Sequence, residues 1–217
     1  MPFYPVIGVN ESLGPHAAAI FRETFGKKNE VSTEASQLAY TVVIGHALFV
    51  VFSSASFDAA HQTAVGHDLN PALLAWLEQT LRQNRKKYPY LFVVSNLPAF
   101  STDATGGIYR GFDEDEVSRS AFWRILWQNG VLAYFCSGEH LYDRSNRYGI
   151  WQIISGGAGA PLYKKGPDRA FAHFLLVRIP SDGTAPPRVQ VFDTEGRLVD
   201  EFDIISREYP IFQLRIS

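Results

Sequence analysis

The strongest constraint on the fold is a central stretch in which helical segments alternate with short, wholly apolar strands. Residues 70–87 begin with Asn-Pro, carry four leucines at helical spacing and end in three basic residues. This pattern indicates an amphipathic helix with an asparagine cap and favourable charge at its C-terminal end. The strand Y-L-F-V-V follows at residues 90–94, then a second predicted helix at 117–128 and a second apolar strand at 131–136. Because continuously apolar strands are buried on both faces, the sequence predicts an α/β sheet covered by helices.

The segments on either side of this stretch are predicted mainly as strands. Towards the start we expect a strand at 4–7, a helix at 17–25, a hairpin of strands 39–44 and 47–52, and a polar loop at 54–69. A strand at 150–154 precedes three alternating strands at 174–179, 188–192 and 198–204, which form an antiparallel β-meander. The order of elements predicts one α/β domain over residues 1–217, with mixed sheets and the meander at its C-terminal end.

Composition excludes several classes of function. The 217 residues carry a formal net charge of −2 without a basic stripe, so neither nucleic acid nor an anionic membrane surface is an expected partner. No apolar run reaches the roughly 18 residues that cross a bilayer, and the first residues lack the pattern of a signal peptide. The compartment stays open. The single cysteine, Cys136, excludes an internal disulfide and a cysteine-rich zinc site.

Common catalytic motifs are missing from the sequence. Neither G-x-S-x-G nor H-E-x-x-H occurs, and the glycines and lysines of residues 156–165 fit no phosphate-binding loop. Cys136 and His140 are close in sequence, but a cysteine that ends an apolar strand is predicted to be buried and inert. His61 and His67 share a polar stretch that we expect to be a solvated loop rather than a metal site.

Four segments stand out when they are read in order. They are P-V-I-G-V-N-E at 5–11, V-V-S-N-L-P at 93–98 after a W-L-containing helix, S-G-E-H-L-Y-D-R at 137–144, and G-G-A-G-A-P-L-Y at 156–163. They resemble the G-N-H-E, G-H-x-P, G-H-x-H-x-Y-x-R and glycine-rich segments of calcineurin-like metallophosphoesterases, specifically the purple acid phosphatase-like branch. The resemblance spans essentially the whole chain. It implies a layered α-β-β-α sandwich with mixed sheets.

The resemblance also implies where metal ligands would lie, and the sequence departs from the family there. The family holds two bridged metal ions, one of them through the asparagine of G-N-H-E and two histidines. Here Val9 and Asn10 stand at the asparagine and histidine of G-N-H-E; a shift of one residue would instead make Asn10 the ligand and Glu11 the replacement for histidine. The vestigial ligand positions in the other two segments are Asn96, Gly138 and His140, of which only His140 keeps the family's residue type.

These departures decide the expected chemistry. One imidazole and up to two neutral amides are a poor donor set for zinc or iron, which prefer nitrogen, sulfur or charged carboxylate ligands. We therefore expect no catalytic residue and no cofactor; the alternative is a divalent metal, zinc, iron or manganese. For His140 the other interpretation is a hydrogen-bonded structural residue. Glu11, Tyr142 and Arg144 are candidates for lining the remaining cleft. For Tyr142 the alternative is packing in the core, and for Arg144 the alternative is a local salt bridge.

The family's first two strands, with their D-x-H and G-D motifs, have no counterpart before residue 4. In the family these strands lie inside a sheet, so the strand at 4–7 would have an open edge. We expect that edge to be covered by an upstream segment, by an unknown partner protein or by a second copy, unless the sheet is rearranged.

Three hypotheses for function follow. The first is a metallophosphoesterase-fold protein without catalysis, a binding or assembly module that uses the 99–116 loop and the cleft around Asn10, Asn96 and His140. The second is a metal-dependent hydrolase of phosphomonoesters or phosphodiesters, or a fragment of one, with a reduced or partner-completed metal site. The third is a structural protein that supports an oligomer.

Overall fold

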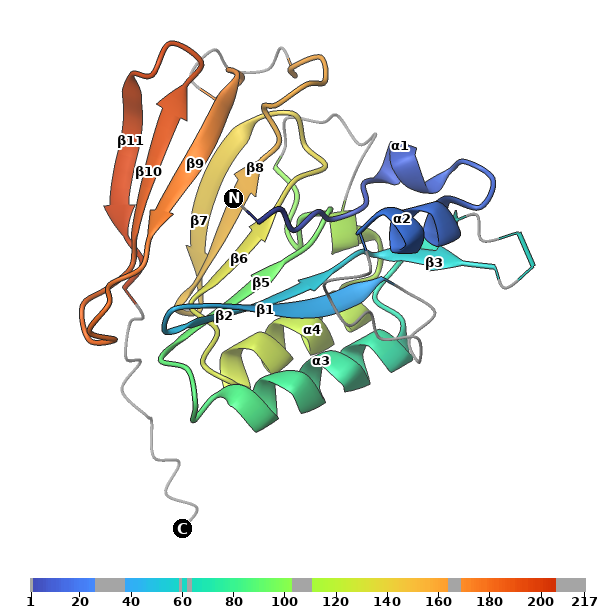
Figure 1. Ribbon diagram of the computed structural model, residues 1–217, viewed down its shortest axis with the longest axis horizontal. Helices are drawn as coiled ribbons and strands as arrows, with labels where there is room; N and C mark the ends of the chain where they lie inside the picture. The colour runs from blue at the N-terminus through green and yellow to red at the C-terminus, as the bar shows by residue number, and fades with distance from the viewer. Residues whose placement is uncertain are drawn as a thin grey trace.

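The computed structural model describes residues 2–25, 38–58, 60–61, 64–102, 111–163 and 169–205. Its principal sheet has six strands in the spatial order β1-β2-β5-β6-β8-β7 (Figure 1). The central pairings of β2 with β5, β5 with β6 and β6 with β8 are parallel, whereas β1 and β7 pair antiparallel at the two edges. The mixed sheet predicted from the sequence is therefore confirmed. The strands are β1 (Ala39–Ile44), β2 (Ala47–Phe52), β5 (Tyr90–Val94), β6 (Ala133–Cys136), β7 (Tyr142–Arg147) and β8 (Ile150–Ser155).

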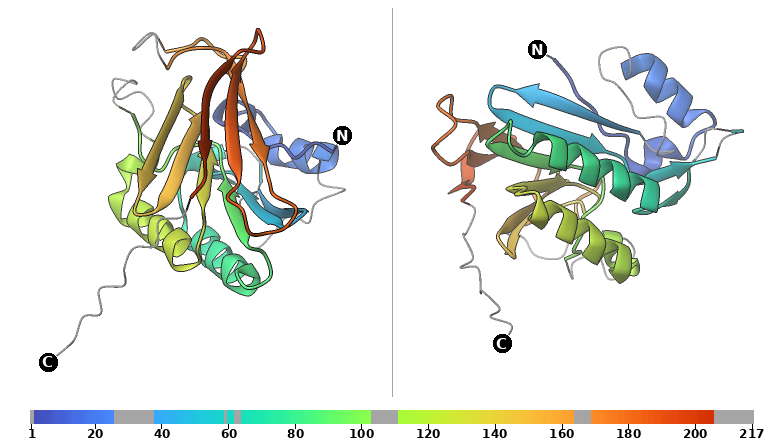
Figure 2. Two further views of the ribbon diagram at one scale, coloured as in Figure 1. Left: turned by 90° about the vertical axis from the view of Figure 1, so that its left-hand side faces the viewer. Right: turned by 90° about the horizontal axis from the view of Figure 1, so that it is seen from below.

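Two helices, α3 (Pro71–Asn84) and α4 (Glu116–Gln128), cover one face of this sheet (Figure 2). Helix α3 begins as its sequence predicts, because the side-chain oxygen of Asn70 accepts a hydrogen bond from the Leu73 N–H at 2.8 Å. Its leucine stripe is fully buried, at 0% exposure for Leu73, Leu77 and Leu81. Burial of each such side chain contributes about 1.5–3 kcal/mol, so packing rather than helix propensity holds α3 in place.

A three-stranded antiparallel sheet, ordered β11-β10-β9, packs on the opposite face of the larger sheet (Figure 2). Its strands are β9 (His173–Arg178), β10 (Arg188–Asp193) and β11 (Leu198–Asp203). Val189 and Val191 of β10 are fully buried against a core that includes Phe92 and Ile153 of the larger sheet. This sheet is the predicted β-meander. Inward-facing residues alternate with outward ones along β10, as expected for a strand with one buried face.

The N-terminal part of the chain starts over the middle of the molecule and runs to the end away from the three-stranded sheet (Figure 1). It contains α1 (Val9–Ser12) and the predicted helix α2 (Ala17–Phe25). The strand predicted at 4–7 is wrong: these residues form no ladder with any described strand. Side chains bind the carbonyls of this segment instead, because the Tyr40 hydroxyl donates to the Pro5 oxygen at 2.6 Å and Ser53 Oγ donates to the Ile7 oxygen at 3.3 Å.

Two further local predictions are wrong. The loop predicted at 54–69 contains a short antiparallel pair, β3 (Ala55–Phe57) and β4 (Ala64–His67). No strand is predicted between those at 131–136 and 150–154, but the structure has β7 there, whose sequence Y-D-R-S-N-R has no apolar pattern. An edge strand that pairs on one side only tolerates such a polar sequence. In the predicted 99–116 loop, residues 103–110 lie outside the described ranges, and a short 3-10 helix, η3 (Gly111–Glu114), leads into α4. No helix in the described part of the chain is long and apolar enough to cross a bilayer.

Candidate functional site

A polar cleft of about 260 Å³ opens where the parallel strands β5, β6 and β8 end, beside the start of α1. Carboxyl ends of parallel strands are a common place for ligand sites, because the loops that follow them converge there. The cleft is lined by residues 8–11, Asn96, Ser137, Gly138, His140, Ser155, Gly156, Ala158 and Ala160. The four vestigial positions Asn10, Asn96, Gly138 and His140, together with Glu11, therefore meet in one place although they are up to 130 residues apart in sequence (residues 10 and 140).

Asn96 is almost fully buried, and its side-chain oxygen is already satisfied by protein donors. Oδ1 accepts hydrogen bonds from the Ser54 N–H at 2.9 Å, from Ser54 Oγ at 3.0 Å and from Ser95 Oγ at 3.2 Å. The backbone N–H of Ser54 can only donate, so this oxygen is fixed in orientation. A metal ion would need that same oxygen. The Nδ2 group, which can only donate, is buried without a hydrogen-bond partner among the described residues.

His140 is the one residue of the cleft that is arranged like a metal ligand. Its Nδ1 lies 2.8 Å from the Pro161 carbonyl oxygen, and its ring stacks on Tyr163 at a centroid distance of 4.9 Å. The carbonyl can only accept, so Nδ1 carries the proton and Nε2 is the acceptor of the neutral ring. Histidines that bind metals are commonly oriented by such a second hydrogen bond.

Gly138 occupies a position where a side chain does not fit. Its φ is +86°, and an added Cβ would lie 2.8 Å from Leu97 Cδ2 and 3.0 Å from the Asn96 carbonyl oxygen. Residues with a side chain rarely adopt this backbone conformation. A histidine ligand at residue 138 therefore requires a different path of the chain between β6 and His140.

Asn10 and Glu11 lie on α1, and both are exposed. Behind this helix lies His67, which the sequence placed in a solvated loop and which ends β4 instead. His67 Nε2 is 3.4 Å from Ser12 Oγ and its Nδ1 is 3.4 Å from Ser54 Oγ, so it connects α1 to the Asn96 environment. Burial lowers the pKa of His67, which keeps the ring neutral at pH 7. Nothing in the local sequence around His67 signals this contact.

Two further groups, His61 and Cys136, do not contribute to a metal or nucleophile site. His61 is exposed and lies 3.2 Å from Asp58 rather than near His67. Cys136 is buried with its Sγ 3.6 Å from the Ile153 carbonyl oxygen, and burial raises the pKa of its thiol, so it is not an activated nucleophile. Among the described residues, no three His, Cys, Asp or Glu side chains lie close enough together to hold a metal ion.

Solved structures with a similar arrangement of elements include two phosphatases. Purple acid phosphatase PPD1 from yellow lupin (Lupinus luteus) seeds superposes with a TM-score of 0.57 and 16% identity, over 76% of this chain and 32% of its own. A dimetal phosphatase from Danio rerio gives a TM-score of 0.52 and 15% identity, over 78% of this chain and 61% of its own. GAP50, described as the anchor in the inner membrane complex of Plasmodium, gives a TM-score of 0.65 and 13% identity, over 94% of this chain and 65% of its own.

The chain has a calcineurin-like metallophosphoesterase fold. The fold implied by the sequence resemblance is thereby confirmed. No family model and no curated protein sequence matches the chain. It spans about a third of the lupin phosphatase and just under two thirds of the other two proteins.

Within this metallophosphoesterase fold, Tyr142 and Arg144 do not line the cleft. The sequence left them as candidates for it, with core packing and a salt bridge as the alternatives. They lie on β7 and face Asp200 of β11. The Tyr142 hydroxyl and Arg144 Nε each donate to Asp200 Oδ2 at 2.6 Å. Burial alone would raise the pKa of Asp200, but the hydrogen bonds from Arg144 and Tyr142 lower it overall. These residues tie the two sheets together, which is a structural role.

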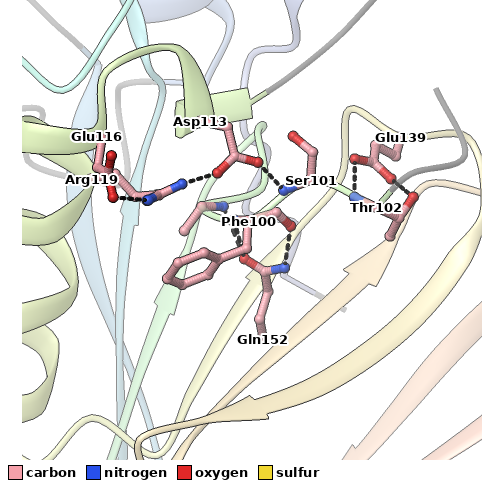
Figure 3. A network of polar contacts seen from close by, with 9 residues as sticks. Phe100, Ser101, Thr102, Asp113, Glu116, Arg119, Glu139 and Gln152 are labelled. Atoms are coloured by element: carbon pink, nitrogen blue, oxygen red, sulfur yellow. Dashed lines mark hydrogen bonds and ion pairs between the residues drawn. The ribbon is translucent and has the colours of Figure 1, made fainter. Parts of the chain in front are cut away.

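The loop that follows Asn96 is held by side chains from three other elements (Figure 3). Gln152 of β8 accepts hydrogen bonds from the N–H groups of Ala99 and Phe100, at 2.9 Å each, and donates to the Phe100 oxygen at 2.7 Å. Asp113 of η3 accepts from the Ser101 N–H at 2.7 Å, and Glu139 accepts from the Thr102 N–H at 2.8 Å. Four consecutive backbone N–H groups are thus satisfied by side chains, so the loop is fixed without regular secondary structure.

Proposed function

We propose that this metallophosphoesterase-fold chain is a binding or assembly module that does not hydrolyse phosphoesters. The orientation of Asn96 carries the proposal. It stands where the family resemblance places a histidine ligand, its oxygen accepts three protein hydrogen bonds, and its free Nδ2 can only donate. An amide whose oxygen is occupied and whose nitrogen can only donate provides no atom to bind a cation.

The other donors of the cleft support the same conclusion. A catalytic pair of divalent metals needs several charged or imidazole ligands, including a bridging carboxylate, to offset its charge. Among the described residues, those that line the cleft include one imidazole, His140, and one carboxylate, Glu11, which comes from the exposed face of α1. This donor set does not fit two metal ions. At residue 138 the backbone admits no added ligand without rearrangement.

A partner of this module would be a protein or a second copy of the chain. GAP50, which superposes over 94% of this chain, is described as the anchor in the inner membrane complex of Plasmodium, and this supports a scaffold role. The net charge of −2 argues against nucleic acid as the partner. Edge strand β1, with Val43 and Ile44 about half exposed, is the proposed contact for a second copy.

One observation favours a second candidate function, a metal-dependent phosphoesterase with a reduced or partner-completed site. His140 has its Nδ1–H bound to a carbonyl and its Nε2 available, as in many metal-binding histidines. A single zinc, iron or manganese ion held by His140, Glu11 and groups from another chain is the form that such a site would take.

Metal analysis and a hydrolysis assay separate the two candidates. We expect purified protein to contain substoichiometric zinc, iron and manganese, and to hydrolyse aryl phosphate mono- and diesters at the background rate with or without added metal. His140→Ala is compared with His46→Ala, which removes an exposed histidine outside the cleft. Stoichiometric metal, with hydrolysis that His140→Ala abolishes and His46→Ala retains, would establish the enzyme instead.

A further inference from the structure

A groove of about 530 Å³ lies along α4, on the helix-covered side of the molecule and separate from the polar cleft. Its walls are mostly aromatic and its charged groups are arginines, apart from one glutamate. The residues that matter here are Phe100, Arg119, Trp123, Arg124, Trp127 and Tyr148. They come from three places in the chain: the loop after β5, helix α4 and the turn between β7 and β8.

The aromatic rings of the groove are only partly used by the fold. Trp123 forms the floor at 5% exposure, with its ring 4.9 Å from Phe100 in an edge-to-face contact. Trp127 and Tyr148, by contrast, are 56% and 69% exposed. Large aromatic side chains left in water lose the stabilisation that burial provides. Two of them on one groove mark it as a contact surface.

Tyr148 also has an unfavourable backbone conformation. It and Gly149 have φ values of 56° and 88°, and together they connect β7 to β8. Positive φ at both positions of a two-residue hairpin turn favours asparagine followed by glycine. Tyrosine at the first position is strained, and its exposed ring gains nothing from packing. Local strain of this kind is found where a side chain is needed for contact with another molecule.

The arginines in and beside the groove differ in whether they form ion pairs. Arg119 forms ion pairs with Asp113 and with Glu116, the latter at 3.2 Å. Arg124 is exposed on α4, and the guanidinium of Arg147 lies 4.3 Å from the centre of the Phe100 ring. Arg124 lines the groove and forms no ion pair within the described residues, whereas Arg147 does not line it and interacts electrostatically with Asp143. The groove therefore offers one cation, Arg124, to a ligand carboxylate.

Phe100, Arg119 and Trp123 of the groove are held by contacts within the fold. Phe100 belongs to the loop segment held by Gln152 and Asp113, and the Arg119 guanidinium lies 4.9 Å from its ring centre (Figure 3). The Trp123 Nε1–H donates to the Arg147 carbonyl oxygen at 3.2 Å, which joins α4 to β7. A preformed groove binds with less loss of conformational freedom than one that must be ordered.

From this geometry we infer that the groove binds an extended segment of a partner protein, with a proline or aromatic ring seated on Trp123, Trp127 and Tyr148 and an acidic side chain at Arg124. This inference rests on the proposed binding role and names the kind of partner. Tryptophan, tyrosine and arginine are the residue types that dominate binding energy at protein interfaces. Extended and proline-rich peptides bind aromatic grooves of this sort. An acidic side chain of the segment complements Arg124, which has no ion pair among the described residues.

Selection from a library of random 12-residue peptides displayed on phage, against the full chain, tests the inference. We expect enriched sequences to contain aspartate or glutamate next to a proline or aromatic residue. One such peptide, synthesised and titrated by calorimetry, is expected to bind at least about tenfold more weakly to Trp127→Ala and to Arg124→Glu. Its affinity for the full chain should fall as salt is added.

Two further variants separate binding from folding. Tyr148→Asn is expected to raise the melting temperature, because asparagine suits the turn, while it weakens peptide binding. Leu198→Ala, which truncates an exposed side chain on β11, should leave both unchanged. Absence of enrichment, enriched peptides without acidic residues, or equal binding to Trp127→Ala and Leu198→Ala would each overturn the inference. None of these outcomes changes the expected result of the metal and hydrolysis assays, so those assays test the proposed function separately.

Discussion

Replacement of Gln152 by leucine is the sharpest test of how the loop after β5 is held. Gln152 is 1% exposed and makes three hydrogen bonds to Ala99 and Phe100. Leucine fills similar space without a donor or acceptor. Ala99 is fully buried, so leaving its N–H without a partner would cost about 1–3 kcal/mol of stability. Phe100 is half-buried, and loss of the hydrogen bonds to its N–H and its C=O would cost about 0.5–1.5 kcal/mol each. The added apolar burial returns roughly 1 kcal/mol. The net expectation for Gln152→Leu is a loss of about 3 kcal/mol.

Urea unfolding followed by tryptophan fluorescence measures this loss, and a chain of this size should melt about 6–12 °C lower. Gln152→Glu is the matched control. It keeps the acceptor for both N–H groups but donates to the Phe100 oxygen only when protonated, so its deficit should shrink as the pH falls. A loss below about 1 kcal/mol for Gln152→Leu would show that these amides find other partners, and the account of the loop would be wrong.

Three other substitutions test the remaining contacts. Burial raises the pKa of Glu139, although the hydrogen bonds from Thr102 act in the opposite direction. The stability that the neutral carboxyl contributes is therefore lost as the pH rises through the raised pKa. In Glu139→Gln, the unfolding free energy measured with urea between about pH 5 and pH 8 should depend less on pH than in the unmodified protein. Gly138→Ala should cost about 1–3 kcal/mol in the same assay and more than Gly130→Ala, whose φ is also positive but whose added Cβ meets nothing within 4 Å. Asp200→Asn should lower the unfolding free energy by about 1–2 kcal/mol at pH 7 and by less at about pH 3. The pKa of Asp200 is lowered in the folded protein, so the stability that its carboxylate contributes is present above the unfolded pKa and is lost in acid. An unchanged pH dependence for Glu139→Gln, equal costs for the two glycines, or an Asp200→Asn deficit that persists in acid would contradict the respective account.

The elements that the sequence predicted well carry their own local signals. Helix α3 has its cap, its proline and its leucine stripe within one segment, and the strand Tyr90–Val94 is apolar throughout. The hairpin of β1 and β2 turns at Gly45, whose φ is +57°. Strand β7 and the pair β3 and β4 were missed because their sequences are polar or short, and their pairing depends on neighbours far away in the chain.

The candidate cleft was predicted only in part, for a similar reason. Family resemblance indicated which residues would gather, and the structure brings Asn10, Asn96, Gly138 and His140 together. The saturation of the Asn96 oxygen depends on Ser54, which is 42 residues away, and no sequence pattern signals it. Tyr142 and Arg144 were candidates for the cleft lining, with core packing and a salt bridge as the alternatives; alternation along β7 directs both side chains to Asp200. The groove along α4 was not foreseen, because Trp127 and Tyr148 come from separate segments.

The Gln152 contacts have a consequence for the order in which this protein forms. The amides of Ala99 and Phe100 are satisfied by a side chain 53 and 52 residues further along the chain, so they cannot be protected until β8 has docked. Their exchange with deuterated solvent therefore reports the detachment of β8. Amides within α3 bond to their own helix and stay protected through such an event. Comparison of the two sets of exchange rates gives the free energy of opening at this edge of the sheet, separately from global unfolding.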